Sequence, residues 1–113
     1  MEKNQIVAAL AALAQGSRLD TYRLLVQAGP EGMPAGEIAA ELGVAPNTLS
    51  FHFDRLRHAG LVKFERHGRS LIYAARYDTM NALINYLTEN CCGGRVQQFK
   101  LASRVTKRKK EAV

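Results

Sequence analysis

The sequence lacks the main features of secreted and membrane-bound proteins. It contains no tryptophan, and its only two cysteines are adjacent, so they cannot build the disulfide framework of a small secreted fold. No apolar run approaches the roughly 18 residues that a membrane span requires, and the N-terminus has no signal-peptide pattern. We therefore expect a cytoplasmic protein with reduced thiols and no membrane partner.

The signatures of enzyme active sites are missing as well. No Ser/His/Asp arrangement, paired carboxylates or phosphate-binding glycine loop is visible in the 113 residues. The three histidines, His52, His58 and His67, all lie in the middle of the chain, which argues against a tetrahedral zinc site. We expect no catalytic residues and no required cofactor.

The net charge of +6 is unevenly distributed along the chain. Residues 1–44 carry three basic and five acidic side chains, whereas residues 45–76 carry six basic and two acidic ones. Residues 91–113 add seven basic side chains and one acidic one. A basic middle segment followed by a basic terminus indicates attraction to nucleic-acid phosphates, although a charge run is more often only a solvated segment.

Apolar spacing predicts a mainly helical domain over residues 1–92, followed by a basic tail over residues 93–113. Ser17 is expected to cap the second helix, and residues 31–34 are expected to form a loop. The helices are expected over residues 3–14, 17–28, 35–42, 46–58 and 78–92.

Residues 46–58 have the pattern of a DNA-recognition helix that follows a tight turn. Leu49, Phe53 and Leu56 are spaced to face the core, so the opposite side carries short polar groups that can hydrogen-bond to base edges. Phe51 could contact thymine methyl groups or pack against the preceding helix, and His52 could contact DNA or serve as a buried structural residue. The candidate DNA-binding residues on this helix are Asn47, Thr48, Ser50, Phe51, His52 and Arg55.

A short β-hairpin with a basic tip follows this helix. Alternating apolar residues predict strands over residues 61–65 and 70–74, with a turn that runs from Arg66 to Arg69 and contains Gly68. Arg66 and Arg69 would project from this narrow loop toward DNA phosphates or the minor groove. The helix and the hairpin together predict a winged helix-turn-helix.

The order of these elements and several short motifs resemble the ArsR/SmtB family of bacterial metalloregulatory repressors. The similar segments run from Ala11-Ala-Leu-Ala-Gln-Gly-Ser-Arg-Leu19 through E-I-A-A-E-L, T-L-S-F-H-F and H-A-G-L-V to the hairpin. The resemblance implies a mainly α winged helix-turn-helix with a two-stranded β-wing, and a homodimer built from the first and last helices. It also implies binding to operator DNA with an inverted repeat.

Cys91 and Cys92 are the candidate metal ligands. Two neighbouring thiolates can chelate one thiophilic ion, and trivalent arsenic or antimony prefers sulfur ligands. The pair resembles the vicinal cysteines late in the last helix of an arsenic-responsive branch of the family. This resemblance implies that As(III) or Sb(III), inorganic or methylated, is the inducer. That branch has a third thiol downstream, but residues 95–99 contain none, so solvent, a small thiol or a methyl group on arsenic would complete the site.

Two alternatives to arsenic sensing remain for the cysteine pair. The thiols could respond to oxidants or reactive sulfur species in a repressor of the same fold, or they could be inert packing residues. Apolar residues on the first and last helices are expected to form the dimer interface. These are Ile6, Leu10, Leu13, Leu83, Ile84 and Leu87.

Overall fold

The computed structural model describes residues 1–94, so most of the expected basic tail lies outside the described residues. The chain divides into two compact units, Met1–Leu83 and Ile84–Val113. The first unit contains the whole helix-turn-helix and the hairpin. Within residues 1–94, no helix combines the length and the apolar character that crossing a bilayer requires.

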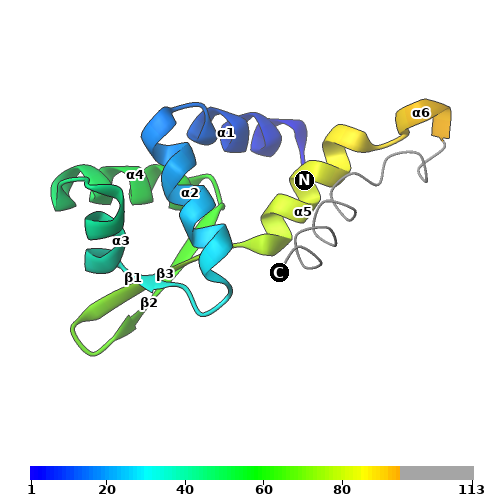
Figure 1. Cartoon of the computed structure of the whole chain (residues 1–113). Helices are drawn as coiled ribbons and strands as arrows, with labels where there is room; N and C mark the ends of the chain where they lie inside the picture. Colours follow the sequence, from blue (N-terminus) through cyan, green and yellow to red (C-terminus); the bar gives the residue numbers. More distant parts are fainter. Residues whose placement is uncertain (95–113) are drawn as a thin grey trace, which may run out of the picture. The chain divides into compact units, whose positions relative to one another are not determined.

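The described chain is mainly helical with a small antiparallel sheet (Figure 1), which confirms the expected fold class. The third and fourth helices have the expected bounds. In chain order the elements are α1 (Lys3–Leu13), α2 (Gly16–Ala28), β1 (Met33–Pro34), α3 (Ala35–Leu42), α4 (Pro46–His58), β2 (Val62–His67), β3 (Ser70–Ala75), α5 (Tyr77–Thr88) and α6 (Cys91–Gly94).

A tight turn connects α3 to α4. Gly43 has a left-handed backbone with φ of 65°, and the Val44 backbone N–H donates to the Ala39 carbonyl at 3.1 Å. This is a common way to end a helix, because the left-handed glycine lets following N–H groups reach the last free carbonyls. The chain then enters α4 through Ala45, which is the N-cap residue of that helix.

The sheet has three strands in the order β1-β3-β2, because β1 pairs with the edge of β3 that β2 leaves free. The expectation of a loop over residues 31–34 is therefore wrong at Met33 and Pro34. Gly32 makes this pairing possible: its φ is 75°, and a Cβ atom there would overlap the backbone carbonyl of Tyr73. Only glycine satisfies both conditions without strain.

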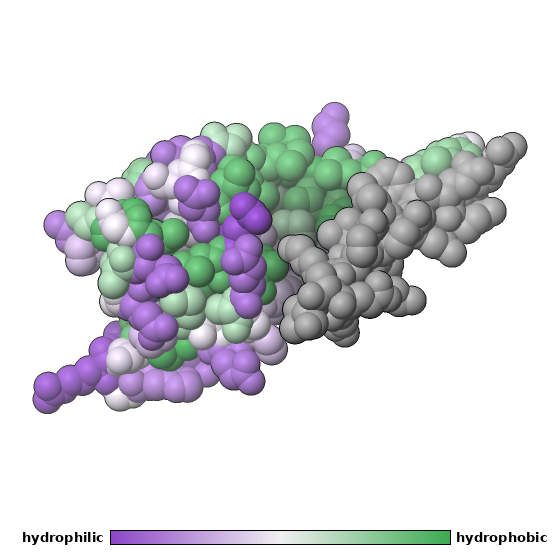
Figure 2. Space-filling view, in the orientation of Figure 1, coloured by the Kyte–Doolittle hydropathy of each residue, from purple (hydrophilic) through white to green (hydrophobic). Residues whose placement is uncertain are grey.

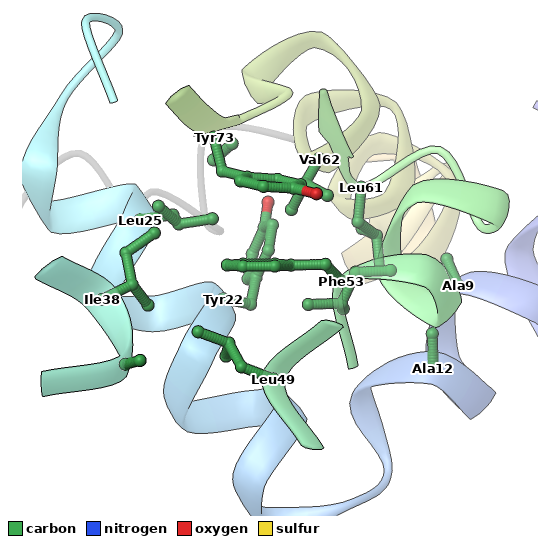
Figure 3. Close-up of a cluster of buried hydrophobic side chains, with 13 residues drawn as sticks. Ala9, Ala12, Tyr22, Leu25, Ile38, Leu49, Phe53, Leu61, Val62 and Tyr73 are labelled. Atoms are coloured by element: carbon green, nitrogen blue, oxygen red, sulfur yellow. The ribbon is translucent and has the colours of Figure 1, made fainter. Parts of the chain in front are cut away.

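One hydrophobic core joins α1, α2, α3, α4 and the sheet within the first unit. Its most buried side chains include Leu25 of α2, Ile38 of α3 and Leu56 of α4. The parallel rings of Phe53 and Tyr73 lie in the middle of this cluster (Figure 3). The core therefore holds the recognition helix against the sheet that carries the wing.

Two helix ends differ from the sequence expectations. The cap of α2 is Gln15, whose side-chain oxygen accepts the Arg18 backbone N–H at 2.9 Å, so the assignment of Ser17 as the cap is wrong. The last long helix, α5, ends at Thr88 rather than at Cys92. Asn90 has a left-handed φ of 60° just before the cysteine pair, and Cys92 within the pair has a left-handed φ of 56°.

Candidate nucleic-acid interface

The helix α4 presents a polar face to solvent because its apolar side chains point into the core. Leu49, Phe53 and Leu56 are buried, as their spacing predicts. Pro46 is the first helical residue, a position where its missing N–H costs no hydrogen bond. The exposed side chains on the opposite face are those of Asn47, Thr48, Ser50, Phe51 and Arg55. Small polar groups in the first turns allow the backbone of such a helix to approach base edges.

Phe51 points away from the core and forms a pair with Arg55. The residue is 52% exposed, so about half of its surface is open to solvent. The Arg55 guanidinium carbon lies 4.9 Å from the centroid of this ring. At that distance the ring attracts the guanidinium through a cation–π interaction. The exposed face therefore carries an apolar group and a cation in a fixed relative position.

His52 does not belong to this exposed face. Its side chain is only 6% exposed, and its Nδ1 atom has no hydrogen-bond partner within the described residues. Burial, and to a smaller extent the charge of Arg18, lowers the pKa of the imidazole. The inclusion of His52 among the exposed DNA-binding candidates is therefore corrected, because the ring lies inside the protein next to the core.

The wing consists of β2 and β3, with basic residues at its tip. Cα pairing extends to His67 and Ser70, so only Gly68 and Arg69 form the turn, and Gly68 supplies φ of 64°. Arg66 lies in the strand opposite Leu71, which corrects the expected four-residue turn. Both arginines are still exposed, and the tip of the wing is strongly hydrophilic (Figure 2). The wing can therefore present two cations at the end of a rigid ladder.

Comparison with known proteins identifies the family. The helix-turn-helix domain family matches residues 13–63. The chain is 30% identical over 88 residues to the HTH-type transcriptional regulator YgaV of Escherichia coli, an alignment that covers 78% of this chain and 87% of that protein. It is also similar to HlyU from Vibrio cholerae, with 29% identity, a TM-score of 0.64, and coverage of 81% of this chain and 99% of that chain.

A further similar structure carries the family name. It is the homodimeric winged helix-turn-helix DNA-binding domain of Mb0332 from Mycobacterium bovis, described as a possible ArsR-family transcriptional regulator. It has 29% identity and a TM-score of 0.63, with coverage of 77% of this chain and 81% of that chain. This chain belongs to the ArsR-like transcriptional regulators. In this fold α4 is the second helix of the helix-turn-helix, and β2 and β3 form the wing.

The sequence pattern does not identify two basic residues of this ArsR-like regulator, Arg18 and His58, as part of the candidate interface. Arg18 belongs to the acidic N-terminal part, and His58 carries no motif of its own. The fold nevertheless brings both beside Arg55, around a hollow of about 300 Å³ between α1, α2 and α4. Local charge counting cannot detect such a cluster, because its members come from two helices that are distant in the sequence.

The cysteine pair of this ArsR-like regulator lies in the second unit, in the single turn α6. Because α5 has already ended, the expectation that the pair sits at the end of the last long helix is corrected. Cys91 is partly buried and Cys92 is exposed. Desolvation and the neighbouring Cys92 thiol raise the pKa of Cys91. Within residues 1–94, no group of three or more His, Cys, Asp or Glu side chains is placed to hold a metal ion.

Proposed function

We propose that this protein is a sequence-specific repressor that binds operator DNA through α4 and the wing. The observation that carries the proposal is the exposed polar face of α4, which lies next to the basic wing and opposite the buried face of the same helix. Asn47, Thr48 and Ser50 would contact base edges, whereas Arg66 and Arg69 would contact phosphates. Bound to an operator, such a protein blocks transcription by occupying the promoter.

The operator-binding form is proposed to be a homodimer. Exposed apolar side chains support this proposal: Val7 and Leu10 on α1 are 55% and 42% exposed, and Leu87 on α5 is 58% exposed. Figure 2 shows hydrophobic surface along α1. Ile6 and Leu83, which we expected at the interface, are instead buried within the first unit. The related Mb0332 domain is homodimeric, and a two-fold dimer would read an inverted repeat.

The inducer is proposed to be trivalent arsenic or antimony, inorganic or methylated, bound by Cys91 and Cys92. The reaction starts from neutral thiols: each S–H proton leaves with one hydroxide of As(OH)₃ as water, while an As–S bond replaces an As–O bond. Two thiols thus yield a dithiolate of As–OH, or of As–CH₃ when a methylated arsenical reacts. The raised pKa of Cys91 is compatible with this condensation, because no preformed thiolate is required.

Release from DNA would follow from a change in the turn that holds the cysteines. Chelation requires both sulfur atoms on one side of the turn, whereas Cys92 has a left-handed backbone at φ of 56°, a region unfavourable for residues with a side chain. Cys91 lies four residues beyond Leu87, an exposed residue of the proposed dimer interface. A rearrangement of the turn at Cys91 would therefore occur close to that interface in the sequence. Coupling of typically about 1–3 kcal/mol between inducer and operator sites is enough for a transcriptional response.

A titration of operator complexes tests the inducer. The duplex is selected from a random library by the wild-type protein, and the complex is then titrated with arsenite, antimonite and methylarsonous acid. Cys91→Ser and Cys92→Ser should bind the duplex like the wild type but should not release it, because one sulfur cannot chelate. Ser17→Cys serves as a matched thiol control that leaves the pair intact. If Cys91→Ser or Cys92→Ser releases the duplex like the wild type, the pair is excluded as the sensor.

A thiol redox or reactive-sulfur response is the second candidate. It is favoured by the exposure of Cys92, which gives an oxidant direct access to one thiol. The raised pKa of Cys91 argues in the other direction, because oxidants react with thiolates. Mass spectrometry after separate exposure to arsenite and to peroxide distinguishes the two candidates by the mass added and by which exposure dissociates the complex.

A further inference from the structure

A hollow of about 300 Å³ lies beside α4, lined by residues of α1, the first turn of α2 and the last turn of α4. Four alanines from α1 and from the end of α4 line it, so no large side chain fills the space. The remaining lining residues are Arg18, Arg55 and His58. All lie within the unit Met1–Leu83. Basic groups from two helices thus surround one open space with small walls.

Each of the three groups is held in place by one interaction, and the two arginines keep other N–H donors available. The Nε atom of Arg18 donates to the Ala12 carbonyl at 2.7 Å, which leaves the terminal nitrogens of its guanidinium. His58 Nδ1 lies 2.7 Å from the Asp54 carbonyl, so Nδ1 is the donor there and the ring orientation is fixed beside the hollow. Arg55 is held over the ring of Phe51. Such prior ordering lowers the entropy cost of binding an anion.

No acidic side chain neutralises this cluster within the described residues. The ion pairs found in residues 1–94 join Arg57 to Asp54, His67 to Glu65, and Arg76 to Asp78. None of them includes Arg18 or Arg55. Asp54 lines the adjacent hollow, but its carboxylate is paired with Arg57 at 3.1 Å. The hollow therefore presents uncompensated positive charge.

We propose that the hollow binds one backbone phosphate of the operator, in addition to the phosphates that the wing contacts. The inference rests on the proposed function. DNA is favoured over a free phosphate as the occupant because Arg55 belongs both to this hollow and to the exposed face of α4. A second hollow, lined by Phe51, Asp54, Arg55 and His58, continues along the same helix. Since α4 contacts α1 and α2 as well as β2, the two phosphate-binding regions would flank the base-reading helix.

Substitution of single phosphates tests the inference. A set of selected duplexes carries one neutral methylphosphonate each, and their affinities are compared for the wild type, Arg18→Gln and the matched control Arg23→Gln on the same helix. The glutamine side-chain amide can still donate to the Ala12 carbonyl, so Arg18→Gln preserves this contact with the end of α1. Ala11→Glu places a carboxylate in the hollow at an exposed helix position, and Gln27→Glu is its charge-matched control.

The wild type should show a phosphate, outside those affected by Arg69→Ala, whose neutralisation weakens binding about tenfold. In Arg18→Gln and Ala11→Glu that position should become silent, and for Arg18→Gln the logarithmic salt slope should fall by about 0.9. Both controls should resemble the wild type. If the wild type selects no duplex, the proposed function fails. If it selects one but Arg18→Gln and Ala11→Glu keep the wild-type phosphate pattern, only this inference fails.

A free phosphate in the hollow is a separate outcome that would also overturn it. Inorganic phosphate is added at constant ionic strength to the wild-type protein without DNA. The backbone amide chemical shifts of the protein in NMR spectra, or its melting temperature, are followed. Saturable binding that Arg18→Gln abolishes, together with an unchanged methylphosphonate pattern, would assign the hollow to a soluble anion instead of DNA.

Discussion

The ring of Phe53 on α4 stacks on the ring of Tyr73 on β3, with ring centroids 3.7 Å apart and an interplanar angle of 8°. Phe64 of β2 packs against the same tyrosine at 5.5 Å, and the Arg57 guanidinium lies 5.7 Å from the Phe64 ring. These aromatic contacts connect the recognition helix directly to both strands of the wing. The spacing between the exposed polar face of α4 and the basic tip of the wing is therefore set by the core rather than by a flexible linker.

Phe51→Ala should weaken operator binding and remove sensitivity to one thymine methyl group. The exposed ring is placed to contact such a methyl, a contact within the range of about 1–3 kcal/mol for base discrimination. Replacing single thymines by deoxyuridine in the selected duplex should weaken the wild type at one position in each half-site and leave the mutant unaffected there. Equal sensitivity of both proteins at every thymine would show that Phe51 reads no base.

Arg66→Ala and Arg69→Ala should each weaken binding to all duplexes, whatever their sequence. Loss of one phosphate contact should lower the slope of log affinity against log salt by about one. Arg23→Ala on α2 removes the same charge away from the wing and should leave the slope unchanged. Wing mutants with the wild-type slope would place the wing away from DNA.

Gly32→Ala should destabilise the fold markedly. The positive φ and the overlap of a Cβ atom with the Tyr73 carbonyl together should cost about 1–3 kcal/mol or more of unfolding free energy. Gly16→Ala is the matched control: nothing lies within 4 Å of its added Cβ and its φ is not positive, so a gain of about 0.4–1 kcal/mol is expected. Urea unfolding measures both. Similar effects of the two substitutions would contradict the observed β1–β3 pairing.

Acid should destabilise the protein through His52. Burial and Arg18 lower the pKa of His52 in the folded state, so the unfolded chain takes up the proton more readily. The stability contribution of the neutral ring is present above the unfolded pKa of about 6.5 and is lost as the pH falls below it. His52→Leu should flatten the dependence of unfolding free energy on pH between about 7 and 5. His58→Gln, at an exposed position, should retain it.

Much of the recognition helix could be predicted from the sequence, because its pattern is local. The spacing of Leu49, Phe53 and Leu56 determines which side of α4 is buried, and the bounds of α3 and α4 follow from Gly43 and Pro46. The exposure of Ser50 follows from the same periodicity. Local patterns of this kind do not depend on what the rest of the chain contributes.

Features that depend on distant contacts could not be predicted. Met33 and Pro34 form a strand only because β3 offers a free edge, and the two-residue segment has no alternation to detect. His52 adjoins the buried stripe, so periodicity alone left its environment open, whereas packing near Arg18 buries it. The early end of α5 also contradicts the apolar spacing, which continues beyond Thr88.

Ser50→Ala shows whether the exposed face of α4 reads DNA sequence. Its affinity is measured by fluorescence anisotropy for the selected duplex and for a scrambled duplex of equal length at the same salt concentration. Ser50→Ala should bind the selected duplex about 5- to 100-fold more weakly, as expected for one lost base contact, with no change on the scrambled duplex or in melting temperature. Unchanged affinity for the selected duplex would contradict the assignment of this face.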